Sequence, residues 1–262
     1  MKPRGTTAVA LTVAGSDSGG GAGIQADLKT FRAHQVFGTS VITCVTAQNP
    51  KCVSAVQAMG PRIVAEQMDR VFEAFRVDGA KTGMLYDAAI IETVAVGFAR
   101  RRFHKLIVDP VMGATSGALL LRKDAIAAFK TKLLPQAALV TPNLPEAEAL
   151  WQRSIRTLDE LREAARALTE RFGVPFLVKG GHLPGAKRAV DVLYDGNRLR
   201  EFSGPRVRNV RPHGAGCAFS AAIAANLALG YGLVESIRRA KVFVRKAIRD
   251  SIRLGRSWAL NI

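Results

Sequence analysis

The residues best suited to chemistry are Gly214, Ala215, Gly216 and Cys217, which stand directly before a run of small apolar residues at 218–225. Glycines let backbone N–H groups approach an anion closely, and the start of a helix attracts negative charge. The spacing predicts an anion hole at residues 214–216, with Cys217 in the first turn of a helix. At that position the helix dipole lowers the pKa of a thiol. The alternative is a cysteine that only fills space in the core.

A second glycine-rich segment spans residues 15–23, Gly-Ser-Asp-Ser-Gly-Gly-Gly-Ala-Gly. Such a turn can bring its N–H groups close to a ligand, just before the helical pattern that begins at Ile24. The segment lacks the Gly-Lys-Ser/Thr ending of a P-loop, and its glycine spacing differs from that of a dinucleotide site. Both a ligand-binding turn and a merely tight turn fit these residues.

Polar residues that follow apolar runs complete the set of candidates. Gln48 and Asn49 carry amides that can read the edge of a heterocycle. The carboxylate of Asp109 can face a metal or a phosphate, or it can cap a helix. Asn143 and Glu146, three residues apart at a helix start, can both reach one hydrated Mg²⁺, or they can form a capping box.

Short runs rich in Val, Ile and Leu alternate with helical patterns, and these elements must position the candidates. We expect strands at residues 8–14, 40–46, 106–111, 138–140 and 176–179, and a further helix that begins at the Thr157–Glu160 capping box. Residues 191–202, around Asp195-Gly196-Asn197, predict a β-hairpin. The alternation predicts one α/β domain over residues 1–262, whose mostly parallel sheet is covered on both faces and binds ligands at its carboxyl ends.

The chain is strongly basic: 38 Lys and Arg against 21 Asp and Glu give a net charge of +17 over 262 residues. One expected helix has a basic face and an apolar face. The basic face is formed by Arg238, Lys241, Arg245, Arg249 and Arg253. The apolar face is formed by Val234, Ile237, Val244, Ile248 and Ile252. No aromatic residue interleaves with the basic ones on that face, which favours a solvated outer face over a nucleic-acid platform. Three cysteines exclude a disulfide framework, and no apolar run reaches the ~18 residues that span a membrane.

Six motifs occur in order along the chain: Ala14-Gly15-Ser16-Asp17 with Gly-Gly-Ala-Gly-Ile-Gln-Ala-Asp at 20–27, Ala47-Gln48-Asn49, Lys81-Thr82-Gly83-Met84, Asp109-Pro110-Val111-Met112, Lys179-Gly180-Gly181-His182 and Gly214-Ala215-Gly216-Cys217. Together they resemble the hydroxymethylpyrimidine/phosphomethylpyrimidine kinase family of thiamine biosynthesis, within the ribokinase-like superfamily. The resemblance covers about residues 8–248. It implies a three-layer α/β/α fold and two ATP-dependent phosphorylations, first of 4-amino-5-hydroxymethyl-2-methylpyrimidine and then of its monophosphate.

The resemblance also implies roles for individual residues. The pyrimidine would be bound by Gly15, Asp27, Gln48, Met84 and Val111, with Gln48 as the reader of its edge. ATP would be bound by Asp109, Thr141, Asn143 and Lys179, and Mg²⁺ by Glu146 and Asp109. The anion hole would be Gly214, Ala215 and Gly216, and Cys217 would take the place of the catalytic base. A cytoplasmic homodimer is expected as well.

Cys217 stands where sugar kinases of the superfamily have an aspartate. A neutral thiol would admit the dianionic monophosphate, which a carboxylate would repel. The chain departs from the family pattern at Ala118, which replaces a carboxylate, and at Arg211-Pro212, which replaces Asn-Thr. It departs again at Gly255-Arg256-Ser257-Trp258, where the family has Gly-His-Gly-Pro. The alternatives are a pyridoxal or pyridoxine kinase of the same fold and a non-catalytic, nucleic-acid-binding regulator.

Overall fold

The structure is a computed structural model that describes residues 7–113, 120–207, 210, 213–255 and 257–262. Its main feature is a nine-stranded sheet with the order β3-β2-β1-β4-β5-β6-β7-β8-β9. These strands are β1 (Val9–Asp17), β2 (Phe37–Asn49), β3 (Cys52–Ala58), β4 (Gly79–Thr82), β5 (Leu106–Val108), β6 (Leu139–Val140), β7 (Phe176–Gly180), β8 (Arg188–Tyr194) and β9 (Leu199–Pro205). The strands from β2 to β7 pair in parallel, and β3, β8 and β9 are added antiparallel at the two edges.

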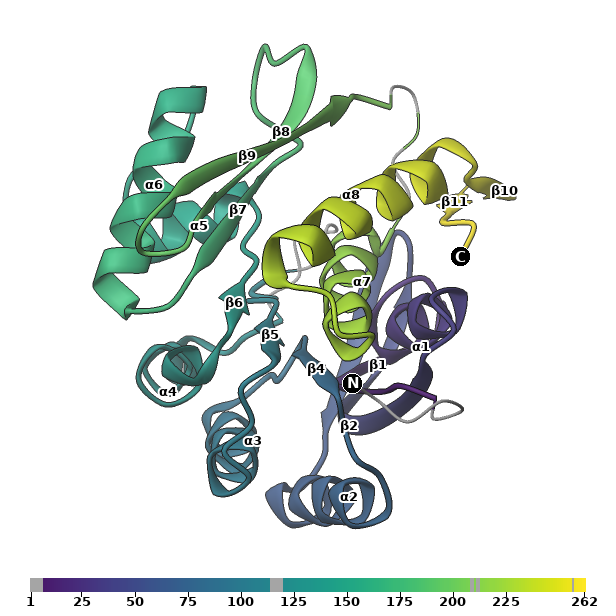
Figure 1. Cartoon of the computed structure of the whole chain (residues 1–262). Helices are drawn as coiled ribbons and strands as arrows, with labels where there is room; N and C mark the ends of the chain where they lie inside the picture. The colour runs from purple at the N-terminus through teal and green to yellow at the C-terminus, as the bar shows by residue number, and fades with distance from the viewer. Residues whose placement is uncertain (1–6, 114–119, 208–209, 211–212, 256) are drawn as a thin grey trace.

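Helices cover both faces of the sheet, which gives three layers (Figure 1). One face carries α1 (Gly23–Ala33), α7 (Ala215–Ala228) and α8 (Leu233–Arg249). The other carries α2 (Pro61–Ala74), α3 (Ala88–Arg100), α4 (Ile126–Ala128), α5 (Leu144–Trp151) and α6 (Leu158–Phe172). The short turns η1 (Lys123–Ala125), η2 (Phe129–Leu133) and η3 (Leu134–Gln136) flank α4, and a small hairpin, β10 (Ile252–Leu254) with β11 (Ser257–Ala259), follows α8. No helix in the described residues is both long and apolar enough to cross a membrane.

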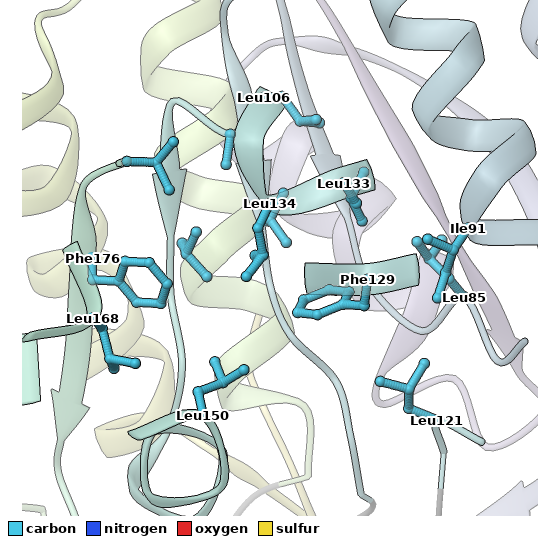
Figure 2. Close-up of a cluster of buried hydrophobic side chains, with 14 of the residues drawn as sticks. Leu85, Ile91, Leu106, Leu121, Phe129, Leu133, Leu134, Leu150, Leu168 and Phe176 are labelled. Carbon is cyan, nitrogen blue, oxygen red and sulfur yellow. The ribbon is translucent and has the colours of Figure 1, made fainter. Parts of the chain in front are cut away.

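The side chains of the parallel strands alternate between the two faces of the sheet, and each face has its own hydrophobic core. In β5, Leu106 and Val108 point into the core below α3 to α6, whereas Ile107 between them points toward α7. Successive side chains of a strand face opposite sides, so each fully apolar strand serves both layers. Figure 2 shows the first of these cores, where Leu106 and Phe176 from the sheet meet Phe129, Leu133 and Leu134. The three-layer α/β/α fold expected from the sequence is confirmed.

The Thr157–Glu160 capping box and the hairpin at 191–202 are confirmed, with Gly196 in the left-handed region at φ 91°. The basic helix is shorter than expected. It ends at Arg249, and the Ser251 hydroxyl lies within hydrogen-bond distance of the last-turn carbonyls of Ala247 and Ile248. Arg253 and Ile252 therefore belong to β10 and not to the two helix faces. On the helix, Arg238, Arg245 and Arg249 are exposed, as expected for a solvated face.

Candidate active site

The candidate residues converge at the carboxyl ends of the parallel strands, beside the first turn of α7. The chain runs from β1 to β2 and β3 on one side of β1, and then crosses back to β4 on the other side, so β1 and β4 form the switch point of the sheet, where ligands bind in such folds. Asp109 follows β5, Asn143 follows β6 and pairs with Lys179 in a bridge, and Lys179 lies on β7. Cys217 is the third residue of α7.

Asp109 and Lys179 form an ion pair, which we call the outer pair. Lys179 Nζ lies 3.0 Å from Asp109 Oδ1, and the Ser220 hydroxyl donates to Asp109 Oδ2 over 3.0 Å. The Thr141 hydroxyl lies 3.4 Å from the same carboxylate. The side chain of Lys179 keeps 14% of its surface exposed, whereas that of Asp109 keeps 2%. The structure thus brings Asp109, Thr141 and Lys179 together, and their contact with a nucleotide stays a prediction.

Lys81 and Asp27 form a second ion pair, the inner pair, with Nζ–Oδ distances of 2.8 and 3.0 Å. Thr12 donates to the same carboxylate over 2.6 Å, and both charged side chains have 0% exposure. Burial alone would lower the pKa of the Lys81 ammonium, but the negative charge of Asp27, above all, raises it above its usual value. Asp27 therefore faces Lys81 inside the protein, and its contact with a pyrimidine stays a prediction.

Cys217 lies close to both ion pairs. Its thiol interacts electrostatically with the lysine and the aspartate of each pair. The Gly23 N–H donates to its sulfur. Burial raises the pKa of the Cys217 thiol to about 11, because the loss of hydration outweighs the attraction of Lys81. The expectation that the helix dipole lowers this pKa is wrong. The thiol is neutral at pH 7.

Backbone N–H groups of the glycine-rich segment bind the side chain of Asp17, which belongs to the same segment. The N–H groups of Gly19, Gly21 and Ala22 donate to the Asp17 carboxylate over 2.8, 3.1 and 2.8 Å. These N–H donors are therefore occupied within the turn. For these three groups, the interpretation of the segment as a tight turn holds. The turn also packs against the predicted anion hole. Gly214 has φ 85°, and a Cβ there would lie 1.8 Å from the carbonyl oxygen of Gly21, so this position requires glycine.

Three of the predicted pyrimidine-binding residues lie around Cys44. Met84 and Cys44 form a small apolar cluster against which Val111 packs, apart from the two main cores. A Cβ on Gly15 would lie 2.7 Å from the Cys44 sulfur and 3.4 Å from the Met84 sulfur, so a side chain there would fill this space. Gln48 stands at the end of β2, and its Nε2 is 2.8 Å from Nε2 of His213.

Asn143 and Glu146 form a complete capping box at the start of α5. The Glu146 N–H donates to Asn143 Oδ1 over 2.9 Å, and the Asn143 N–H donates to Glu146 Oε2 over 2.8 Å. Burial raises the pKa of Glu146 to about 7, helped by the nearby charge of Asp109 and opposed by Lys179. The capping alternative is thus realised, and the role of the carboxylate in binding a metal stays a prediction.

The residues present fit a hydrated Mg²⁺. Among the described residues no group of three or more His, Cys, Asp or Glu side chains gathers as a protein-only metal site. Mg²⁺ needs no such cage, since it keeps several waters and is held by one or two carboxylates together with substrate phosphates. Glu146 and Asp109, which are close enough to influence each other's charge, supply such a pair.

Three residues of this region were not singled out as site residues by the sequence. Lys81 and Ser220 each bond a predicted site aspartate, and His213 contacts Gln48. The signal for Lys81 is a lone charge inside a strand that is buried throughout. The departures at Ala118, Arg211-Pro212 and Arg256 lie outside the described residues. Of the altered tail, Ser257 and Trp258 belong to β11, whose last residue, Ala259, pairs with His213 in a bridge.

The three-layer α/β/α fold, with lysines beside a glycine-rich helix start, is typical of phosphotransferases of the ribokinase-like class. Comparison with known proteins narrows this class. The family model described as phosphomethylpyrimidine kinase matches residues 17–260, and the chain belongs to that family.

Relatives and a solved structure agree with this assignment. The chain is 48% identical over 250 residues to a hydroxymethylpyrimidine/phosphomethylpyrimidine kinase of Rhizobium meliloti, covering 95% of this chain and 93% of the relative. It is 47% identical to a thiamine biosynthesis bifunctional protein of Geobacter sulfurreducens, covering 97% of this chain but spanning only 51% of that longer protein. A crystal structure of Bacillus subtilis pyridoxal kinase, an ADP complex, superposes with a TM-score of 0.90 at 35% identity, covering 97% of each chain.

Proposed function

We propose that the chain, as one kinase domain, transfers the γ-phosphoryl group of ATP to 4-amino-5-hydroxymethyl-2-methylpyrimidine and then to its monophosphate. In the first step the hydroxymethyl oxygen forms a bond to the γ-phosphorus and the bond to the bridging oxygen breaks, so that ADP leaves and the hydroxyl proton is released. In the second step a phosphate oxygen of the monophosphate attacks in the same way. The observation that carries the proposal is the convergence of the inner and outer pairs on the first turn of α7.

The chemistry of phosphoryl transfer explains why this convergence matters. The transition state is loose, so catalysis consists mostly of positioning and of neutralising charge on the transferring group. The first N–H groups of a helix have no partner within the helix, and in α7 they belong to Ala215, Gly216 and Cys217. Lys179 stands beside them, since a Cβ on Gly216 would lie 3.4 Å from its Nζ. These N–H groups and the Lys179 ammonium hold the transferring phosphoryl group.

Glu146 and Asp109 are the residues that would hold Mg²⁺, with the phosphates of ATP as its ligands from outside the protein. The metal, when bound, neutralises negative charge on the phosphate oxygens. Lys179, whose ammonium bonds Asp109 in the structure, would supply a further positive charge for the phosphates. Asn143 positions Glu146 through the capping box.

Cys217 acts in this site as a neutral group. Its thiol keeps its proton at pH 7, so it adds no negative charge where a phosphomonoester must bind. The second substrate needs no strong base, because the second pKa of a phosphomonoester is ~6 and its attacking oxygen is already ionised. A neutral Cys217 therefore suits an enzyme that carries out both steps.

A second candidate is supported by the likeness to a pyridoxal kinase. Pyridoxal also presents a hydroxymethyl group on an aromatic nitrogen heterocycle, and the same phosphate-handling residues would serve it. The two substrates differ at the edge that Gln48 would read, so direct comparison of substrates separates the candidates.

The test is to incubate the purified protein with Mg²⁺ and ATP and to follow ADP release with each of three acceptors: the hydroxymethylpyrimidine, its monophosphate and pyridoxal. We expect release with both pyrimidines and the accumulation of the pyrimidine diphosphate. Release with pyridoxal alone would contradict the main proposal. A Lys179→Met variant serves as the control for contaminating kinases and should lose most of the activity with every acceptor.

A further inference from the structure

His213 contacts the side chain of Gln48, which in the proposed function binds the edge of the pyrimidine. Nε2 of Gln48 lies 2.8 Å from Nε2 of His213, and the same ring nitrogen lies 3.4 Å from Oδ2 of Asp17. The other end of the amide, Oε1, lies 3.2 Å from the Thr46 hydroxyl. Side chains from β1, β2 and the segment before α7 thus meet at one imidazole nitrogen.

The surroundings hold this group in place. The His213 side chain is 15% exposed and that of Asp17 is 3% exposed. The Asp17 carboxylate is fixed by N–H groups of the glycine-rich turn, and the carbonyl of Gly20 in that turn accepts from Lys29 of α1. Behind the imidazole, the His213 backbone pairs with Ala259 of β11. The ring therefore has little freedom to turn away from Gln48.

Proton counting decides which end of the Gln48 amide faces the ring. The Thr46 hydroxyl lies 2.8 Å from the Ser16 carbonyl, which can only accept, so the hydroxyl donates there and its oxygen is left to accept from Gln48. The Asp17 carboxylate favours a proton over a lone pair on the facing nitrogen of His213. Both conditions are met when the amide oxygen faces His213 and the NH₂ group faces Thr46. The oxygen and nitrogen of an amide have nearly the same shape, so this exchange leaves the distances unchanged.

We propose that Asp17 and His213 form a relay that fixes the orientation of the Gln48 amide, with one N–H of its NH₂ group free for the substrate. Asp17 and His213 are positioning residues, and the inference rests on the proposed role of Gln48 in substrate binding. The free N–H selects a heterocycle that presents a ring nitrogen with a lone pair at this edge, as an aminopyrimidine does. A heterocycle without an acceptor there leaves the donor unsatisfied, which is a strong basis for discrimination.

A double-mutant cycle tests the relay through substrate kinetics. We expect His213→Leu and Gln48→Ala each to lower kcat/KM for the hydroxymethylpyrimidine about 10-fold, mainly through KM, which is the effect of one lost hydrogen bond. The double variant should be no worse than either single variant, because both break the same interaction. His213→Gln, which can still donate, should stay within about 3-fold of the wild type. His34→Leu is the matched control, since His34 bonds only within α1 among the contacts described for it, apart from packing on Phe243.

Additive losses in the double variant, or equal losses with pyridoxal and with the pyrimidine, would overturn the relay. A folding defect is recognised by a changed KM for ATP or a lowered Tm in His213→Leu, and the His213→Gln variant then decides by its KM for the pyrimidine. If Gln48→Ala leaves that KM unchanged in an active enzyme, the relay has no substrate group to orient and is refuted, while the kinase activity stands. If the wild type phosphorylates neither pyrimidine, the proposed function itself fails.

The imidazole proton can be observed directly. In a ¹⁵N-histidine-labelled sample, long-range ¹H–¹⁵N spectra distinguish a protonated ring nitrogen from one with a lone pair. We expect Nε2 of His213 to be protonated in the wild type, and the Gln48→Glu variant, which has only acceptors, to keep it so. A lone pair on Nε2 in the wild type would refute the proposed orientation whatever the kinetics show.

Discussion

The inner and outer pairs are chemically alike but differ in their access to a ligand. Each joins a lysine to an aspartate at the carboxyl ends of the strands, and each lies beside Cys217. The inner pair, Lys81–Asp27, is completely enclosed and has Thr12 as an additional donor. The outer pair, Lys179–Asp109, opens toward solvent on the lysine side and borders the titratable carboxyl of Glu146.

This difference in enclosure gives the two pairs different roles: the inner pair keeps its charges in place, and the outer pair can exchange a charged partner for a ligand. An enclosed ion pair loses as much hydration energy as it gains in attraction, so it contributes little to stability but is costly to break on one side. The inner pair therefore holds a fixed charge pattern under the first turn of α7. The outer pair can exchange one partner for a phosphate or a metal, because its charges are less enclosed and have alternative partners in Ser220 and Glu146.

The largest effect is expected when the inner pair is broken on one side. Lys81→Met leaves the Asp27 carboxylate buried without its cation and should lower the free energy of unfolding by about 3–5 kcal/mol. Urea unfolding measures this loss. Lys81→Met combined with Asp27→Asn removes both charges and should recover most of it.

Lys179→Met is the matched control in the outer pair. Asp109 keeps the Ser220 hydroxyl and the site is more open, so we expect a smaller loss of about 1–2 kcal/mol. Equal losses at Lys81 and Lys179 would show that enclosure does not distinguish the pairs.

The second prediction concerns the carboxyl group beside the outer pair. Burial raises the pKa of Glu146 from 4.5 to about 7, so the native state binds this proton more tightly than the unfolded chain does. The stability that this proton supplies is complete below pH 4.5 and is lost as the pH rises through 7. The free energy of unfolding of the wild type should therefore fall relative to Glu146→Gln by roughly 3 kcal/mol between about pH 4.5 and 8. Urea unfolding of both proteins across this range measures it, and a constant difference would mean that Glu146 titrates normally.

Cys217, which lies close to both pairs, gives a third prediction that depends on charge alone. Cys217→Asp puts a carboxylate where the proposed function places the monophosphate, and like charges at close range cost about 2 kcal/mol or more. We expect kcat/KM for the monophosphate to fall about 30-fold relative to kcat/KM for the alcohol, as measured by ADP release.

Cys217→Asn is the matched control, because asparagine has the shape of aspartate without its charge. Its losses should be similar for the two acceptors. The repulsion argument fails if Cys217→Asp leaves the ratio of the two activities unchanged.

Local patterns predicted much of the fold. The strands expected at 8–14 and 176–179 correspond to β1 and β7, and the Thr157 capping box occurs as expected, because each depends on residues that are close in the chain. β4 was not predicted as a strand, since it has only four residues with a lysine among them. Lys81 can be buried there only because Asp27, 54 residues away, neutralises it.

For the site, too, the sequence predicted individual residues but not the contacts between residues that are distant in the chain. Motifs indicated Asp109, Lys179 and the glycines at 214–216, because the resemblance attaches a role to each position. The pairing of these residues, and of Gln48 with His213 over 165 positions, follows from tertiary packing alone. The pKa of Cys217 illustrates the difference: the helix start argues for a lower value, whereas enclosure by distant elements raises it to about 11.

The smallest expected effect compares two capping boxes of the same design. Asn143 caps α5 at the site, and Thr157 caps α6 on the surface, each with a glutamate three residues later. Asn143→Ala and Thr157→Ala should each lower the free energy of unfolding by about 1 kcal/mol in urea. Only Asn143→Ala should also raise KM for ATP at limiting Mg²⁺, because its cap holds Glu146 beside the outer pair. If both variants keep the KM of the wild type, Asn143 is a cap and nothing more, and the outer pair must bind the nucleotide without its help.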